Sequence, residues 1–225
     1  ATLVLDSFRV GMTAGKLGLL VRANGTIALE ASGAFSIQGG GFANASAASI
    51  KLQYNTTGIS YALSNRSLEV NGVSGTLSMA AGSASSPLVA LTAFGMQTDI
   101  GGGLLRASGD FAFSQGTSSS GARVIRVALN RFSTQIGDGS KDYLIMSGGS
   151  GAMVITQTGV AAVLTASAAL QNVPGVSLSA SSFSVALNTM NSAVNEVVAL
   201  GTNLYDIKVR AGPYLSATAN PLSVT

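Results

Sequence analysis

Carboxylates are the side chains of this sequence best suited to acid–base chemistry, because the chain contains no histidine and no cysteine. Those two residue types supply the commonest general base and the most reactive thiol nucleophile. The nine carboxylates are Asp6, Glu30, Glu69, Asp99, Asp110, Asp138, Asp142, Glu196 and Asp206. Hydrolysis of a glycosidic bond needs two such groups facing each other. None of the nine lies in a recognisable acid motif, so we expect no enzyme and no catalytic residue.

One short turn has the spacing of a calcium loop. Asp138, Ser140 and Asp142 in the segment IGDGSKD place alternate oxygen ligands in a glycine-containing turn, which a calcium loop requires. The turn lacks the acidic bidentate ligand that follows in such loops, and it carries Lys141. A polar hairpin turn explains the same residues. We therefore expect no cofactor, with calcium at this turn as the only metal candidate.

Four Asn-x-Ser/Thr patterns are candidate acceptors for N-linked sugar. They begin at Asn24, Asn44, Asn55 and Asn65. Such patterns also arise by chance in a chain rich in serine and asparagine, and O-linked sugar on Ser and Thr is the alternative. A sugar-binding platform would instead need exposed aromatic side chains. The candidates are Tyr54, Tyr61, Tyr143, Tyr205 and Tyr214, although positions at the edge of a core explain them equally.

The segments that would position these side chains recur along the chain. LRASGDFAF at Leu105–Phe113 matches LEASGAFSI at Leu29–Ile37 with an offset of 76 residues, and SLSASSFSV at Ser177–Val185 is a weaker third copy. Low-complexity similarity is the alternative, because Gly, Ala and Ser are abundant. The recurring phenylalanines predict a core position, and they are Phe35, Phe111 and Phe183.

The repeat predicts the domain organisation. We divide the chain into 1–28 as the end of a preceding repeat, 29–104 as repeat 1, 105–176 as repeat 2, and 177–225 as the start of an incomplete repeat 3. Each unit of such an array, of about 75 residues, buries its apolar face on its neighbours. The chain therefore looks like a window of a longer array, or like a subunit whose ends complete each other.

Composition limits the functional classes. Charged residues make up only 9% of the chain, against about 25% in ordinary soluble domains. No apolar run reaches the roughly 20 residues of a membrane-spanning helix, so we expect no transmembrane helix. The net charge is +3 without a basic cluster, which argues against a nucleic-acid partner. The chain starts at Ala1 without a signal peptide, so we expect that one was removed or that the sequence is an internal fragment.

Short apolar alternation bounded by Gly, Ser and Asn predicts an all-β fold. Asn24-Gly25 predicts a hairpin, and Gly11–Gly15 predicts a turn. Gly159–Leu170 fits a strand or a helix, with the repeat favouring a strand, and Val194–Leu200 is open between the two. We expect an elongated repetitive β-structure, either a β-solenoid or β-roll or stacked antiparallel β-sandwich modules.

Three blocks resemble the tandem-repeat modules of very large bacterial extracellular, adhesin-like surface proteins. The blocks are VPGVSLSASSFSVALNT, AVNEVV and VRAGPYLSATA, all in the second half of the chain. Ser181 departs from the pattern, which has Gly at that position. The resemblance is one of patterns and transfers no functional residue. It implies a secreted, repetitive, structural or adhesive protein of the bacterial cell surface.

These observations favour a noncatalytic extracellular structural repeat protein. It would form part of a stalk, sheath or filament through strand pairing and apolar stacking, with copies of itself or adjacent repeats as partners. The alternative is an adhesin-like surface module that binds glycans. A polysaccharide-acting enzyme on a β-solenoid is the third hypothesis and the least favoured.

Overall fold

A computed structural model describes residues 2–5, 8–39, 43–62, 67–70, 73–117 and 123–224. Its regular structure consists of fifteen β-strands, and the described part contains no helix, hence none that could cross a membrane. The all-β prediction is therefore confirmed. The strands are β1 Thr2–Leu5, β2 Phe8–Val21, β3 Ile27–Gly39, β4 Ala43–Thr57, β5 Ser67–Val70, β6 Val73–Thr76, β7 Ser83–Ile100, β8 Leu105–Thr117, β9 Arg123–Gly137, β10 Asp142–Thr156, β11 Gly159–Val173, β12 Val176–Asn188, β13 Val194–Leu200, β14 Asn203–Val209 and β15 Tyr214–Val224.

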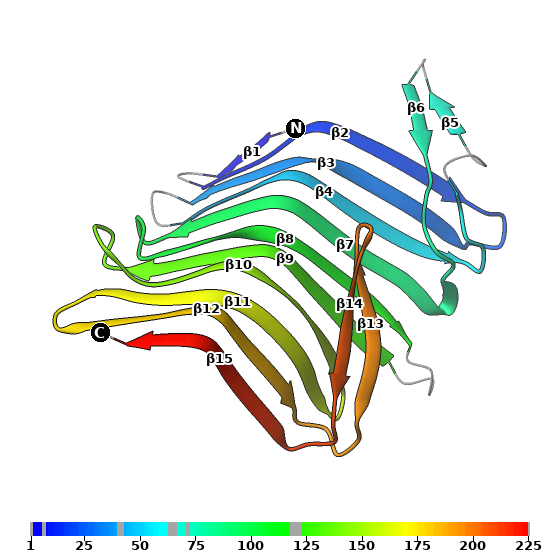
Figure 1. Cartoon of the computed structure of the whole chain (residues 1–225). Helices are drawn as coiled ribbons and strands as arrows, with labels where there is room; N and C mark the ends of the chain where they lie inside the picture. Colours follow the sequence, from blue (N-terminus) through cyan, green and yellow to red (C-terminus); the bar gives the residue numbers. More distant parts are fainter. Residues whose placement is uncertain are drawn as a thin grey trace.

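Eleven of these strands form one open antiparallel sheet in the order β1-β2-β3-β4-β7-β8-β9-β10-β11-β12-β15 (Figure 1). Two hairpins, β5–β6 and β13–β14, are inserted after β4 and β12. The described chain thus forms a single meander, where we expected a solenoid or stacked sandwich modules. Period-2 alternation cannot separate these architectures. Short connections decide between them, because consecutive strands joined by short loops pair with each other.

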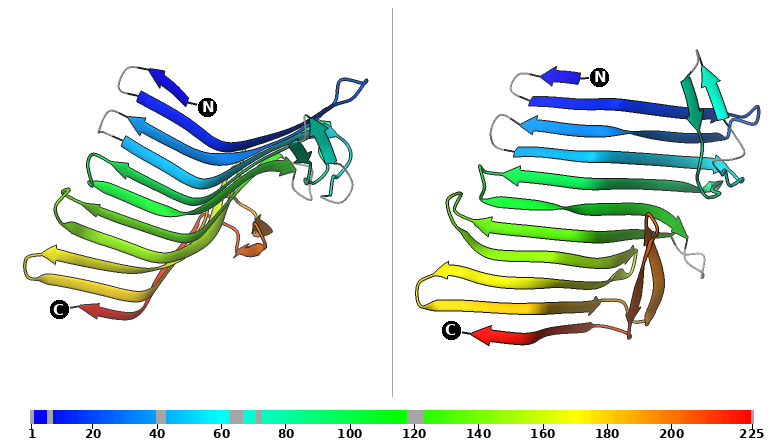
Figure 2. Two further views of the ribbon diagram at one scale, coloured as in Figure 1. Left: turned by 90° about the horizontal axis from the view of Figure 1, so that it is seen from above. Right: turned by 45° about the horizontal axis from the view of Figure 1, so that its top comes forward.

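The long strands bend halfway along their length, so that the sheet forms a trough (Figure 2). The left view of that figure places both hairpins on the outer side of the bend. Register shifts mark β-bulges along this line, and a bulge bends the strand that carries it. The bulges hold residues with positive φ: Ala14 on β2, Gly95 on β7, Arg131 on β9 and Gly148 on β10. The turn predicted at Gly11–Gly15 is therefore wrong, since this segment is a bulge inside β2.

The bend also explains the recurring ASG-x-F motif. Gly33 on β3 and Gly109 on β8 lie opposite bulges of the neighbouring strands. A Cβ atom on Gly109 would lie 3.0 Å from Cα of Phe132 and 3.1 Å from the carbonyl oxygen of Asn130. Glycine is thus required where the neighbouring backbone crowds the strand. In the third copy the bulge lies on β12 itself, so Ser181 is exposed and needs no glycine.

The first two motif copies lie on strands of opposite direction, because β4 and β7 separate β3 from β8 in the antiparallel order. They therefore do not superpose as translated units of about 75 residues. Their common property is their place at the bend of the sheet.

A different correspondence links β3, β4 and β7 to β11, β12 and β15. Asn55 and Asn188 are both fully buried at the ends of β4 and β12. Each side-chain Nδ2 donates to two carbonyl oxygens: that of the residue four positions on, and that of a residue in the segment that leads from the hairpin back to the sheet. For Asn55 these are Ile59 (2.8 Å) and Ala80 (2.8 Å), and for Asn188 they are Ser192 (2.9 Å) and Arg210 (2.8 Å). We call this arrangement the asparagine clamp.

The residues next to each clamp also make matching contacts. Thr56 Oγ1 accepts a hydrogen bond from the Ile27 amide on β3, at 2.8 Å, and Thr189 Oγ1 accepts one from the Val160 amide on β11, at 2.8 Å. Both clamps therefore close the base of an inserted hairpin and tie it to the preceding strand.

Two hydrophobic clusters lie on the outer side, each under one hairpin segment. The larger packs Val198, Leu200 and Ile207 of β13–β14 against small residues of β8 to β11 such as Ala128 and Ala152. The smaller gathers Tyr61, Leu77 and Met79 over Ala28. An ion pair between Arg126 on β9 and Glu196 on β13, at 2.9 Å, fastens the larger hairpin. The ambiguous segments Gly159–Leu170 and Val194–Leu200 are both strands, and Asn24-Gly25 forms the expected hairpin turn.

Candidate functional site

The carboxylates whose side chains are described all accept hydrogen bonds within the chain. The donors are Gln53 for Glu30, the Gly103 amide for Asp99, Arg131 for Asp110, the Lys141 amide for Asp138, Arg106 for Asp142, Arg126 for Glu196 and Lys208 for Asp206. Asp6 and the side chain of Glu69 lie outside the described residues. These contacts join strands, hairpins and turns, which gives the carboxylates a structural use.

Asp110 is the most buried of these carboxylates, with 3% of its surface exposed. Its Oδ2 accepts two hydrogen bonds from the Arg131 guanidinium, at 2.9 and 2.7 Å. Its Oδ1 accepts a third from the Gly95 amide at 2.8 Å. Asp110 therefore fastens three adjacent strands at the bend, because Gly95 and Arg131 are the bulge residues of β7 and β9.

The calcium-loop candidate is a polar hairpin turn between β9 and β10. Asp138 accepts hydrogen bonds from the Tyr143 hydroxyl and from the amides of Lys141 and Ser140. These contacts, the tyrosine hydroxyl first, lower the pKa of Asp138 to about 2. Asp142 pairs with Arg106 at 2.6 Å. The two carboxylates thus already have donors, and no group of three or more acidic, His or Cys side chains gathers among the described residues.

The four glycosylation candidates lie in different environments. Asn24 is exposed in the β2–β3 turn, where its Oδ1 accepts from Thr26, and Asn44 is exposed on β4. Asn55 is fully buried, and its amide nitrogen donates to two carbonyls. The side chain of Asn55 is therefore not accessible to a sugar in the folded chain. Asn65 lies outside the described residues.

The five tyrosines do not form a common platform. Tyr54 lies on the sheet, and Tyr61 is buried with its hydroxyl 3.1 Å from Thr57 Oγ1. Tyr205 and Tyr214 pack against the larger cluster, and burial raises the pKa of Tyr205. Tyr143 belongs to the polar turn, where hydrogen bonding to the Asp138 carboxylate raises its pKa.

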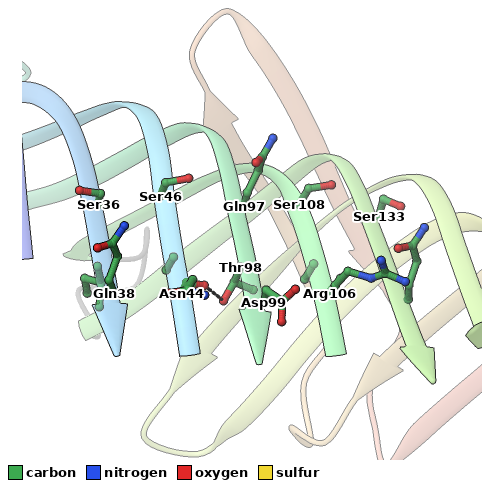
Figure 3. Close-up of a pocket in the computed structure, with 14 residues that line it drawn as sticks. Ser36, Gln38, Asn44, Ser46, Gln97, Thr98, Asp99, Arg106, Ser108 and Ser133 are labelled. Carbon is green, nitrogen blue, oxygen red and sulfur yellow. Dashed lines mark hydrogen bonds between the residues drawn. The ribbon is translucent and has the colours of Figure 1, made fainter. Parts of the chain in front are cut away.

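A shallow polar groove crosses the outer face on the arm away from the hairpins (Figure 3). Its volume is about 480 Å³. Two cross-strand ladders over β3, β4, β7, β8 and β9 supply its polar side chains. They are Ser36, Ser46, Gln97, Ser108 and Ser133, and Gln38, Asn44, Asp99, Arg106 and Gln135. The groove contains no aromatic side chain among its lining residues. In the sequence, the signal for this groove is that polar residues occupy every second position along each of these strands.

The opposite face of the sheet, which we call the inner face, is apolar at most of its positions, with the Gln115 amide, paired with Val89 and Ile125, as an exception. Residues paired across antiparallel strands share a face, so the register defines complete ladders. One ladder crosses ten strands with apolar residues only: Leu17, Ala31, Leu52, Leu91, Phe113, Val127, Met153, Ala162, Leu187 and Leu215.

The other arm of the trough continues this surface. Its ladder is Val10, Ile37, Ala45, Thr98, Ala107, Thr134, Met146, Ala168, Ala180 and Leu222, in which two threonines are the only polar residues. Of the described charged residues, only Arg123 shares the inner face, and it lies at the rim as the first residue of β9. The other charges lie on the outer face, in the hairpins or in turns.

The inner face is accessible, since neither hairpin nor any other described element packs on it (Figure 2). Leu17 is 64% exposed, Leu91 40% and Leu215 71%. The recurring Phe35, Phe111 and Phe183, for which we expected a core position, lie on this face and are half-buried. The alternation of apolar and polar residues is visible in the sequence, but the sequence does not show that the apolar sides of the strands share one face that no other element covers.

Comparison with known proteins adds no assignment: no protein family, no curated protein and no solved structure matches this chain.

Proposed function

We propose that this chain is a noncatalytic structural module of an extracellular assembly such as a stalk, sheath or filament. In this proposal the sheet continues from one module to the next by strand pairing. The location outside the cell rests on the resemblance of Val173–Thr189, Ala193–Val198 and Val209–Ala219 to modules of bacterial surface proteins.

The observation that carries the proposal is the correspondence between the two clamps. By this correspondence β15 takes the place that β7 has in the first half of the sheet, because each returns from a hairpin closed by an asparagine clamp. The far edge of β7 pairs with β8, whereas the far edge of β15 has no strand partner among the described residues. A strand resembling β8, from another module, would continue the same pattern.

The free edge has the chemistry of a pairing site. An edge strand presents a row of unpaired backbone N–H and C=O groups, and another strand can add to it. Most of β15 is exposed, and its 11 residues offer a long ladder. Pairing there would extend both the polar and the apolar face without a break.

Electron microscopy of the purified chain at low and high concentration tests the proposal. We expect fibres at high concentration, in which the sheets of successive chains join edge to edge. The variant Ser216→Lys/Thr218→Lys places two like charges at the edge of β15 and should abolish them. Thr202→Lys/Asn203→Lys makes the same charge change at the tip of the β13–β14 hairpin and should leave them intact. Dispersed monomers of the parent chain at every concentration would refute self-assembly.

The polar groove supports one second candidate, a glycan-binding surface module. Its hydroxyls and amides could hydrogen-bond sugar hydroxyls, although it lacks the aromatic platform common in such sites. Calorimetry with neutral oligosaccharides would show saturable heat that Gln38→Ala/Gln97→Ala abolishes. Absence of heat with the parent chain would remove this candidate. No comparable observation favours a polysaccharide-acting enzyme.

A further inference from the structure

We propose that the inner face binds the hydrocarbon chains of single anionic amphiphiles, such as long-chain fatty acids. This inference goes beyond a structural role, because it gives the sheet a ligand. It starts from the surface that the described chain leaves uncovered: a continuous apolar ladder through ten strands. Large exposed apolar patches on proteins mark interaction sites.

The dimensions of the face suit extended chains. Ten strands about 4.8 Å apart, each with about 13 residues that rise about 3.3 Å, give a face of roughly 45 by 40 Å. An acyl chain spans half of a bilayer core, which is about 15 Å. An extended acyl chain is therefore shorter than either side of this face. Several chains could therefore lie side by side in the trough.

The shape of the face argues against two other apolar occupants, the sheet of a second copy of the chain and the surface of a lipid bilayer. Two sheets pack about 10 Å apart only when their surfaces follow each other. Two troughs placed face to face would meet at their rims and leave the bends apart. A flat bilayer surface would also touch only the rims. Flexible hydrocarbon chains can fill a concave surface without such a mismatch.

The residues of the face favour a ligand of variable shape. Four of the six methionines lie on it: Met12, Met96, Met146 and Met153. Methionine is unbranched and polarizable, and it adapts to irregular partners. Phe111 and Phe132 pack edge to face beside them, with ring centroids 6.5 Å apart. Rigid rings and adaptable thioethers together form a surface that chains of different length can occupy.

The rim supplies a group for an anionic head. Arg123 is exposed at the start of β9, in line with Ile125 and Val127 on the inner face. No acidic side chain among the described residues shares that face. A carboxylate at Arg123 would place the hydrocarbon chain along β9, over the apolar ladders. The ligand is therefore assigned one negative charge and a long apolar tail.

Fluorescence quenching tests the site directly, because a chain without cysteine accepts single-cysteine labels cleanly. One variant carries a bimane label at Val127→Cys on the inner face. A second variant of the same chain carries the label at Ser108→Cys on the outer face. The probe is doxyl-stearate. We expect saturable quenching at Val127→Cys and none at Ser108→Cys.

Variants and chain length sharpen the test. Calorimetry with laurate, myristate and palmitate should show affinity rising about twofold per methylene if half of each methylene is buried. Leu52→Asn/Leu91→Asn places two amides in the apolar ladder and should weaken palmitate binding at least tenfold. Ser46→Asn/Gln97→Asn changes the outer face of the same two strands and should have no effect. Arg123→Gln should weaken palmitate but not hexadecanol.

Three results would overturn the inference. The first is equal quenching at both labels, or none. The second is a dimer of the lipid-free chain that Leu52→Asn/Leu91→Asn converts to monomer, since this would make a second copy the occupant. The third is binding to phosphatidylcholine vesicles without binding of free palmitate. None of these measurements depends on fibre formation, so this inference and the structural proposal can fail separately.

Discussion

Asn55 and Asn188 show how single side chains fix the layout of the sheet. Each amide satisfies two backbone carbonyls that the chain leaves unpaired where it departs into a hairpin and returns. Buried polar groups require such partners, because an unsatisfied one costs about 1–3 kcal/mol. An aspartate of the same shape could not replace these donors.

We predict that Asn188→Ala destabilises the chain by about 2–3 kcal/mol, because it leaves the carbonyls of Ser192 and Arg210 without their donor. Urea unfolding followed by circular dichroism measures this loss. Asn191→Ala, at an exposed position of the same loop, is the control and should change stability by less than about 0.5 kcal/mol. An equal effect of both substitutions would contradict the clamp.

Asp138 makes a pH-dependent contribution to the stability of the folded chain. Its pKa is lowered from 3.8 to about 2 in the folded chain. A lowered pKa means that its contribution to stability is fully present above the unfolded value and is lost as pH falls through the folded value. We expect the melting temperature of the parent chain to fall more than that of Asp138→Asn between pH 4 and about pH 2.

The cause of this shift can be checked by itself. Tyr143→Phe removes the hydroxyl that contributes most to lowering the pKa of Asp138. The carboxyl pKa, followed by NMR titration, should therefore rise toward 3.8 while the two backbone contacts remain. An unchanged pKa in Tyr143→Phe would show that the amides of Ser140 and Lys141 alone hold the carboxylate.

At the scale of elements, the bend is built by bulged strands that flank the strands carrying a glycine. Ala14, Gly95 and Arg131 supply bulges on β2, β7 and β9, whereas Gly33 and Gly109 keep β3 and β8 regular beside them. Asp110 locks this arrangement by bonding to two bulges at once. The trough is thus a property of neighbouring strands together.

Gly109→Ala should destabilise the sheet by about 1–3 kcal/mol, the cost typical of overpacking. Its φ of 151° is rarely adopted by other residues, and its Cβ would crowd Phe132 and Asn130. Gly116→Ala on the same strand would meet only the flexible guanidinium of Arg126, at 3.3 Å, and is the control. Thermal unfolding compares the two. If Gly116→Ala lowered the melting temperature more than Gly109→Ala, the steric explanation of the glycine in the ASG-x-F motif would be refuted.

At the scale of the whole molecule, other described elements pack on only part of the outer face of the sheet. The β13–β14 hairpin shields the outer side of β8 to β11, where Ala128 and Ala161 are fully buried. The inner face has no cover in the described chain. Burial stabilises strands through their apolar contacts, so stability should differ along the sheet.

Hydrogen exchange should reveal this difference. We expect the slowest amides in β8 to β11 beneath the hairpin, and faster exchange in β2 and in the arm that carries the polar groove. Mass spectrometry of peptides after exchange measures it. Uniform protection from β2 to β15 would mean that another layer covers the sheet. Addition of palmitate should slow exchange on both arms if the inner face binds it.

Several properties of this protein follow from the sequence alone. Alternation of apolar and polar residues fixes the strands, because only period 2 places residues such as Phe183, Val185 and Leu187 on one side. Asn24-Gly25 fixes the β2–β3 hairpin, since it supplies the turn geometry that a two-stranded ribbon needs. Scarce charge and the absence of His and Cys restrict acid–base and thiol chemistry whatever fold the chain adopts.

The tertiary structure decided what those strands build. Gly11–Gly15 reads as a turn in sequence, yet pairing with β3 keeps the chain extended and converts it into a bulge. Asn55 reads as a sugar acceptor, yet it lies where a hairpin leaves the sheet and is buried. Local patterns carry no information on which distant backbone groups need a donor or on which face receives a cover. The uncovered inner face, and with it the candidate ligand site, therefore exists only in the folded sheet.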